Sequence, residues 1–198
     1  MQAARGTSLS PGGSAPTPTA RPHRRHLLVF GLVAAVAYAT DQVTKVLAVE
    51  HLTGRPDVQV VGEVLRLHLT RNPGAAFSTG TGFTPVFACL AAVAVVVVLF
   101  LSRRLGSTGW SLALGFLLAG VAGNLTDRLV REPSVLHGHV IDFLMLPNWP
   151  IFNVADICIN VAAGLIIVQT FRGIRLDGTR IASDDEPDAQ EPDPGQTP

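Results

Sequence analysis

Cysteine and charge are both scarce in this sequence. Only two cysteines occur in 198 residues, and both Cys89 and Cys158 lie within apolar runs. Two isolated thiols in such runs behave as small hydrophobes and provide neither a disulfide framework nor a metal-ligand spacing. Charged residues make up 15% of the chain, against roughly 25% in an average soluble domain, and the mean hydropathy is +0.36. These values indicate an integral membrane protein, and nothing in the composition suggests nucleic acid as a partner.

The motifs of several hydrolase classes are missing as well. There is no GxSxG elbow and no HExxH motif, and neither cysteine has a histidine nearby in sequence. Serine and cysteine nucleophiles are therefore weak candidates, and we predict no metal and no cofactor. One alternative stays open, because His137 and His139 lie close to Asp142 and could form a metal site with the carboxylates.

Long apolar runs are what the chain does contain. The first, 27–49, would be about 33 Å long as a helix with a rise of about 1.5 Å per residue, enough to span a bilayer. The others are 83–101, 110–129 and 151–171. We therefore predict an all-α membrane protein with four transmembrane helices. The flanking segments, a leader at 1–26 and an acidic tail at 173–198, are predicted to be disordered.

Basic residues predict the orientation of these helices. Arginines precede the first run, follow the second and follow the fourth, namely Arg21, Arg24 and Arg25, then Arg103 and Arg104, then Arg172 and Arg175. Because positive charge is enriched on the cytoplasmic side, both termini are expected to be cytoplasmic. The loops 50–82 and 130–150 are then expected to face outside.

A cleaved secretory signal peptide is the alternative interpretation of the first run. The basic residues, the apolar stretch and the small residues Ala37 and Ala39 fit its general plan. Against it, the apolar stretch continues to full spanning length, and cleavage would cut the helix just before Asp41.

The first outer loop contains a predicted β-hairpin. Apolar and polar residues alternate from Leu65 to Thr70, and Gly62-Glu63 separates this stretch from the apolar run 58–61. We expect a small extracytoplasmic sheet between the first and second helices, with an unpaired edge that could hold an extended peptide. A turn follows, in which Asn72 supplies an amide and Gly74 allows unusual backbone angles.

Polar residues inside the apolar runs are the candidate functional groups. They form a stripe of Gly120, Asn124 and Asp127 on the third helix and one of Asn153, Asp156 and Asn160 on the fourth. Polar contacts between helices are one explanation, and Gly120, Ala122 and Gly123 would allow close packing. Repeated carboxylates favour function instead, because each adds a charge cost that an amide avoids.

Two of the buried acids have a basic residue close in sequence, whereas a third does not. Lys45 follows Asp41 by four residues, a favourable intrahelical pair, and could also bind a substrate carbonyl or a lipid head group. Arg128 follows Asp127 directly.

Asp142 has apolar neighbours and no adjacent base, so desolvation should raise its pKa. If Asp142 approaches Asp156, the two would share one proton, as in aspartic proteases, and activate water against a peptide bond. Neither role can be assigned to one residue from sequence.

The motifs as a set resemble the lipoprotein signal peptidases of bacteria, also called signal peptidase II. In order they are DQVTK (41–45), RNPGAAFS (71–78), GNLTDR (123–128), HVIDF (139–143) and FNVAD (152–156). The resemblance covers about 27–172. It implies a four-helix aspartic endopeptidase of the bacterial cell membrane. Such an enzyme cleaves prolipoproteins just before a diacylglyceryl-modified cysteine, with membrane lipid as its surroundings.

By this resemblance the catalytic dyad is Asp142 and Asp156. Supporting or substrate-binding positions are Asp41, Lys45, Asn72, Gly74, Phe77, Asn124, Asp127, Arg128, Asn153 and Ala155. The sequence departs from the family pattern at Ile157-Cys158, where many members carry a small polar residue, and this could alter local hydrogen bonding.

Two other functions remain open. A small proton- or cation-coupled transporter could use the same acids as a relay, although no inverted repeat is evident. A non-enzymatic assembly protein could use the polar stripes to bind partner helices.

Overall fold

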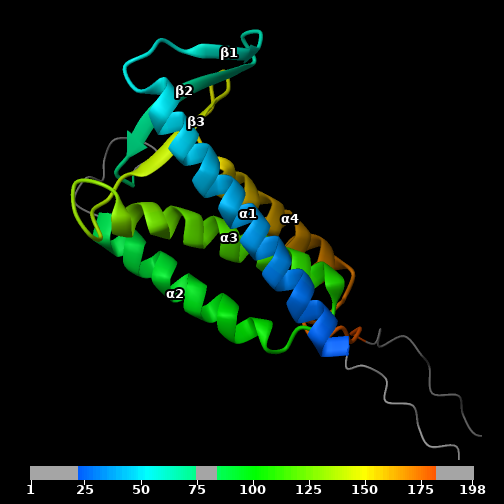
Figure 1. Cartoon of the computed structure of the whole chain (residues 1–198). Coiled ribbons are helices and arrows are strands. Elements are labelled where there is room, and N and C mark those ends of the chain that lie inside the picture. Colours follow the sequence, from blue (N-terminus) through cyan, green and yellow to red (C-terminus); the bar gives the residue numbers. More distant parts are fainter. Residues whose placement is uncertain (1–21, 75–83, 182–198) are drawn as a thin grey trace, which may run out of the picture.

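Four helices make up most of the structure, a computed structural model that describes residues 22–74 and 84–181. They are α1 (Pro22–Leu52), α2 (Thr84–Ser102), α3 (Thr108–Val130) and α4 (Val154–Phe171). Each is long and apolar enough to cross a membrane (Figure 1). The prediction of four spans is confirmed.

The helix ends differ from the predicted ones for local reasons. Helix α1 begins at Pro22 instead of residue 27, because proline is favoured at the first helical position and the basic residues after it are good helix formers. Helix α4 begins at Val154 instead of residue 151. The Asn153 side chain caps this helix by accepting from the backbone N–H of Asp156. In turn, the Asp156 carboxylate accepts from the backbone N–H of Asn153.

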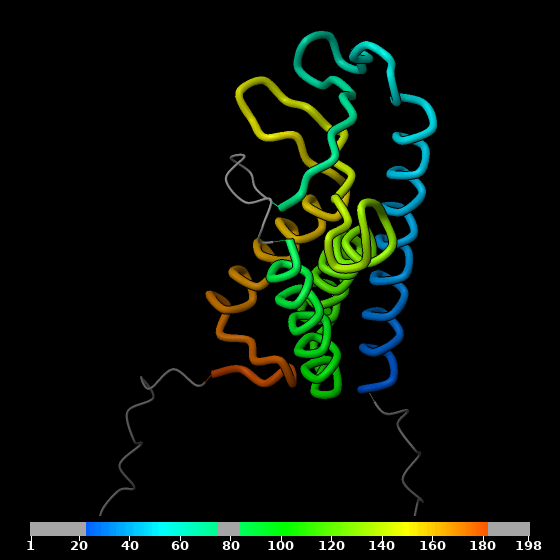
Figure 2. Tube along the Cα trace, turned by 90° about the vertical axis from the view of Figure 1, so that its left-hand side faces the viewer, coloured from blue at the N-terminus to red at the C-terminus, as the bar shows by residue number. Residues whose placement is uncertain are grey.

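Helix α3 is the centre of the bundle, since it packs against α1, α2 and α4. Figure 2 shows it between the other helices. Small residues make this approach possible, as the sequence predicted. A Cβ atom on Gly120 would lie 2.5 Å from the backbone oxygen of Ala155, and one on Gly123 would lie 2.4 Å from Oδ2 of Asp41. These two glycines therefore let α3 meet α4 and α1 at close range.

The predicted hairpin is confirmed, but the sheet has a third strand that the sequence did not reveal. Strands β1 (Val58–Val61), β2 (Leu65–Asn72) and β3 (Val140–Met145) form an antiparallel sheet in the order β1-β2-β3. Strand β3 comes from the connection between α3 and α4, so the sheet does not lie wholly between the first two helices. Its first four residues are all buried, which removes the alternation that marks a half-buried strand.

The two ends of the bundle have different contents. The strands gather at one end, and α1 begins at the other (Figures 1 and 2). The segment 173–181, assigned above to the tail, is held at this second end. There Gly106 N donates to Leu176 O, and Trp110 Nε1 donates to Ile174 O. Leu176 packs against the apolar cluster around Leu105, which explains why this short segment is ordered.

Large apolar side chains cover the outside of the helices. Exposed examples occur along α1, α2 and α4, among them Leu28, Leu32, Leu90, Val93, Val96 and Ile167. Such a surface is unfavourable in water and suits a lipid environment. With the four spanning helices, it makes this a multi-pass membrane protein.

Candidate active site

A buried ion cluster joins α1 to α3. Lys45 Nζ lies 2.9 Å from Asp41 Oδ2 and 2.7 Å from Asp127 Oδ2. It also donates to Asn124 Oδ1 at 3.0 Å. The predicted pair of Asp41 and Lys45 is confirmed. The cluster satisfies two carboxylates that would otherwise be costly to bury.

Arg128, the basic residue next to Asp127 in sequence, attracts Asp127 electrostatically, but it donates its hydrogen bond to the backbone oxygen of Asn124 at 3.1 Å. The ion pair of Asp127 is with Arg131, whose Nε lies 2.5 Å from Asp127 Oδ1. The spacing of four residues on one helix face was the signal for Arg131, since adjacent residues on a helix point in different directions.

Asp142 lies on β3, buried and 3% exposed, where two amides hydrogen-bond to it. Asn153 Nδ2 donates to its Oδ1 at 2.6 Å, and Asn72 Nδ2 donates to its Oδ2 at 2.9 Å. Burial raises the pKa of Asp142 from its ordinary value of 3.8 to about 6, against the lowering effect of these amides and of Lys45. The nearby charge of Asp156 adds to the rise. The predicted direction of this pKa is confirmed.

Asp156 is the third residue of α4 and receives its own pair of donors. Asn124 Nδ2 donates to its Oδ1 at 2.9 Å, and the backbone N–H of Asn153 donates to its Oδ2 at 3.2 Å. Asn153 therefore contacts both acids, through its side chain to Asp142 and its backbone to Asp156. The same Asn153 Nδ2 donates to Asn124 Oδ1 at 3.1 Å, which completes the network.

Groups that can only donate fix the orientation of the three amides. Lys45 faces Asn124 Oδ1, the backbone N–H of Asp156 faces Asn153 Oδ1, and the backbone N–H of Gly74 faces Asn72 Oδ1. Neither an ammonium nor an amide N–H can accept a hydrogen bond. Each amide oxygen is thus held toward a donor, and each NH₂ group faces an acid.

A cavity of about 860 Å³ opens onto both Asp142 and Asp156. Its polar wall includes Thr70, Arg71, Asn72 and Asn160, and its apolar wall includes Trp149, Ile151, Phe152, Ile157 and Val161. Ile157 and Val161 are also exposed on the outer surface of α4. The cavity therefore joins a pair of acids to an apolar surface.

Three further predicted positions are Ala155, Gly74 and Phe77. Ala155 is fully buried and donates its backbone N–H to Asp41 Oδ1 at 2.8 Å. Gly74 has φ +119, and a Cβ there would lie 2.8 Å from Phe87. Phe77 lies outside the described residues.

Lys45 does not reach the cavity, because it is fully buried and its three N–H donors all have partners. The suggestion that it binds a substrate or a lipid head group was therefore wrong. His137 is exposed on the connection between α3 and β3, beside Ser134. Across residues 22–74 and 84–181, no group of three His, Cys, Asp or Glu side chains could hold a metal ion.

The chain matches a known protein family over most of its length. The family described as signal peptidase (SPase) II matches residues 33–172. A lipoprotein signal peptidase of Rhodococcus jostii (strain RHA1) is 47% identical over 171 residues, 86% of this chain and 85% of that protein. One from Mycobacterium tuberculosis (strain CDC 1551 / Oshkosh) is 42% identical with the same coverage of both chains. This chain therefore belongs to the signal peptidase II family, a family of proteases.

The fold is similar to that of solved membrane enzymes. A bacterial membrane enzyme determined by the in meso method at 1.9 Å resolution matches with a TM-score of 0.63 and 26% identity, covering 71% of this chain and 91% of its own. A second, determined at 2.3 Å, matches with a TM-score of 0.63 and 24% identity, covering 77% and 93%. The second likeness concerns the fold alone.

Proposed function

We propose that this protein is an intramembrane aspartic endopeptidase that removes signal peptides from bacterial prolipoproteins. Asp142 and Asp156 form its catalytic dyad. The observation that carries the proposal is the single cavity that both acids line, with Asn153 bonded to each. Family membership supports the substrate class. The transporter alternative receives no support from any of the comparisons reported above.

The dyad works by sharing one proton. Asp142, with its pKa raised to about 6 chiefly by burial, holds the proton and donates it to the oxygen of the scissile carbonyl. Asp156 takes a proton from the attacking water. Because the two acids are coupled, the activity follows the protonation of the pair and not of either residue alone.

The cavity walls suggest how the substrate lies. The scissile peptide occupies the polar side, beside Asn72 and Arg71. The diacylglyceryl chains of the modified cysteine lie along Ile157 and Val161, which are open to the lipid on the outer surface of α4. Binding energy from the lipid chains would then position a bond remote from them.

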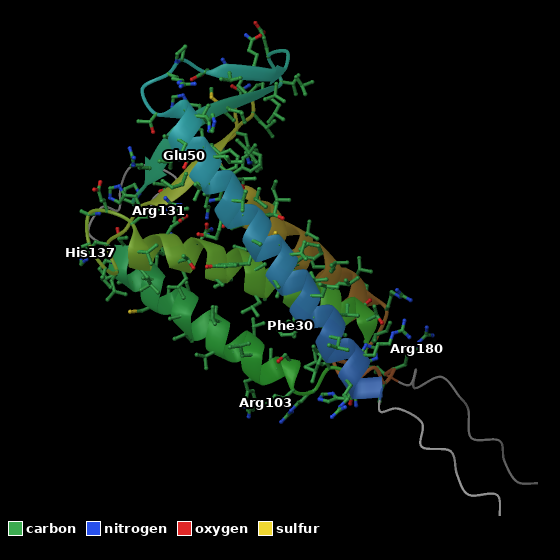
Figure 3. The ribbon with its side chains drawn as sticks, viewed as in Figure 1. Phe30, Glu50, Arg103, Arg131, His137 and Arg180 are labelled. Carbon is green, nitrogen blue, oxygen red and sulfur yellow. The ribbon has the colours of Figure 1, made fainter. Side chains whose placement is uncertain are left out.

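The charges at the two ends support an orientation in the bacterial cell membrane. Among the described residues, the end where α1 begins carries one acid, Asp177. The arginines at this end are Arg24, Arg25, Arg103, Arg104, Arg172, Arg175 and Arg180. Figure 3 labels Arg103 and Arg180 there, and it labels Glu50, Arg131 and His137 at the sheet end. By the positive-inside rule, the arginine end is cytoplasmic and the sheet lies outside.

The test is cleavage of a diacylglyceryl-cysteine prolipopeptide by the purified full chain in detergent. We expect wild type to cleave it, and to cleave the unlipidated peptide at least about tenfold more slowly. Asp142→Asn and Asp156→Asn should each be inactive while folded. Asp57→Asn, an exposed acid paired with His68 on the sheet, is the matched control and should cleave normally.

Equal cleavage of both peptides would remove the lipid-binding role of the cavity. An active Asp142→Asn or Asp156→Asn variant would show that the dyad is wrongly assigned.

A further inference from the structure

Lys45 acts on no substrate directly, yet it lies at the centre of the buried network. It is fully buried, and its ammonium group is bonded to Asp41 at 2.9 Å, Asp127 at 2.7 Å and Asn124 at 3.0 Å. An ammonium group has three donors, so none remains. Apart from its charge, which lowers the pKa of Asp142, Lys45 can therefore affect the reaction only through these three partners.

The first partner holds the segment that carries Asp156. Asp41 binds Lys45 through Oδ2, and its Oδ1 accepts the backbone N–H of Ala155 at 2.8 Å. Ala155 immediately precedes Asp156. N–H groups in the first turn of a helix have no acceptor within the helix, so this carboxylate supplies one for α4. Asp41 thereby ties the start of α4 to Lys45.

The second partner holds the segment that carries Asp142 in the same way. Asp127 Oδ2 binds Lys45 and also accepts the backbone N–H of Ile141 at 3.3 Å. Ile141 immediately precedes Asp142 on β3. Each dyad acid is thus preceded by a residue whose N–H is bound to a buried carboxylate, and one ammonium group binds both carboxylates.

We propose that Lys45 is a positioning residue that sets the distance between Asp142 and Asp156 through Asp41 and Asp127. The proposal rests on the proposed function, since it assumes that these two acids are the dyad. The dyad acids come from different elements, β3 and α4, and Lys45 on α1 is connected to both. The simpler role for Lys45 is to neutralise the buried charges of Asp41 and Asp127. If that were its only role, a longer cation at this position would leave kcat unchanged.

The distance between the acids matters for rate and for protonation. A displacement of about 1 Å can lower a rate by about 10²-fold, because the reacting groups leave their productive geometry. The charge of Asp156 helps to raise the pKa of Asp142, after burial. The other charged groups facing Asp142 are Lys45 on α1 and Arg128 on α3, and Arg71 on β2 lines the same cavity. Moving the acids apart would weaken their repulsion and let Asp142 lose its proton at lower pH.

Lys45→Arg tests this directly, because it keeps the positive charge but lengthens the connection. In the prolipopeptide assay we expect kcat per folded enzyme to fall by about 10²-fold, with KM within about threefold of wild type. The alkaline side of the pH profile should move to lower pH. Because Lys45 also lowers the pKa of Asp142 through its own charge, the fall in kcat at unchanged KM, and not this shift alone, reports altered contact between the acids.

Arg131→Lys is the matched control. This variant replaces arginine by lysine, the reverse of Lys45→Arg, at the residue that binds Asp127 Oδ1. Arg131 lies at the sheet end of α3 (Figure 3), and the hydrogen bonds of the Ile141 and Ala155 N–H groups do not involve it. Its kcat should stay within about threefold of wild type, with the same pH profile. The folded fraction of each variant is measured by thermal unfolding in the same detergent.

The outcomes separate the two roles. Normal kcat in Lys45→Arg would overturn the proposal and leave Lys45 as a neutralising charge, and so would an equal loss in Arg131→Lys. If Lys45→Arg does not fold, Asp41→Asn is the deciding variant. In it the ion pair of Lys45 with Asp127 remains, while the connection from Lys45 through residue 41 to the N–H of Ala155 weakens. A kcat about tenfold lower supports positioning, and an unchanged kcat contradicts it. A wild type that never cleaves, or an active Asp142→Asn, would instead be a failure of the proposed function.

Discussion

Two pairs of buried carboxylates lie within the same bundle, and they are compensated in different ways. Asp41 and Asp127 are bound to cations, Lys45 between them and Arg131 at the rim. Asp142 and Asp156 are bound by amides and contact no cation within hydrogen-bonding distance in the described residues. The carboxylates bound to cations hold α1 and α3 together. Those held by amides line a cavity, as the proposed catalytic role requires.

The largest expected effect is on activity, in the amide-bound pair. Asp142→Asn should lower kcat by at least about 10³-fold, because it removes the proton donor. Its melting temperature should change less than that of Asp127→Asn, since no ion pair is broken. Cleavage of the lipidated peptide and thermal unfolding in one detergent measure both. A variant that is inactive only because it is unfolded would break the comparison.

The next effect is on stability, in the cation-bound pair. Asp127→Asn leaves Lys45 and Arg131 with one carboxylate fewer in a buried site, which should cost about 3 kcal/mol of unfolding free energy. Asp127→Asn should retain measurable cleavage per folded enzyme, since its oxygen can still accept the N–H of Ile141. Denaturation in mixed detergent micelles gives the free energy. Complete inactivity of well-folded Asp127→Asn, with Asp142→Asn still active, would place Asp127 in the dyad.

Close packing around the ion cluster gives a third contrast. Gly123→Ala would place a Cβ 2.4 Å from Oδ2 of Asp41, so it should lower stability by about 2 kcal/mol. Gly164→Ala on α4 meets no atom within 4 Å and should be neutral or slightly stabilising. Thermal unfolding of the two variants compares them, and equal melting temperatures would contradict the close contact of α1 and α3.

Protonation of Asp142 predicts two pH dependences. Because its pKa is raised to about 6, kcat/KM should fall as pH rises through about 6, where the proposed dyad would lose its shared proton. The folded state holds this proton above pH 3.8, so unfolding free energy should decrease as pH rises from 3.8 to about 6. Asp142→Asn should lose that slope in stability. A slope that persists in the variant would belong to another group.

The smallest effect is expected at the exposed pair of Asp57 and His68. These side chains are 36% and 44% exposed, and the atoms lie 2.6 Å apart. Asp57→Asn should change stability by no more than about 0.5 kcal/mol, and less at high salt. A large loss, measured by thermal unfolding at two salt concentrations, would show that the contrast between buried and exposed ion pairs is overstated here.

Local features of the chain were sufficient to predict the spanning helices and the hairpin. Apolar length decides whether a helix can cross a bilayer, and alternation around Gly62-Glu63 marks the two strands. The spacing of Asp41 and Lys45 predicted their ion pair for the same reason, because four residues make about one helical turn. Asp127 and Arg131 have this spacing too, and considering only the adjacent Arg128 missed it.

What the sequence by itself determined were the helices, the hairpin, the pair on α1 and the buried surroundings of Asp142, since each depends on neighbours within a few residues. Only the tertiary structure decided that β3 joins the hairpin, that Asn153 contacts both acids, and that Lys45 lies between Asp41 and Asp127. The contacts between β2 and β3, between Asn153 and Asp142, and between Lys45 and Asp127 each link residues at least 11 positions apart. Their geometry depends on how close α3 can approach α1 and α4, and no local pattern encodes that distance.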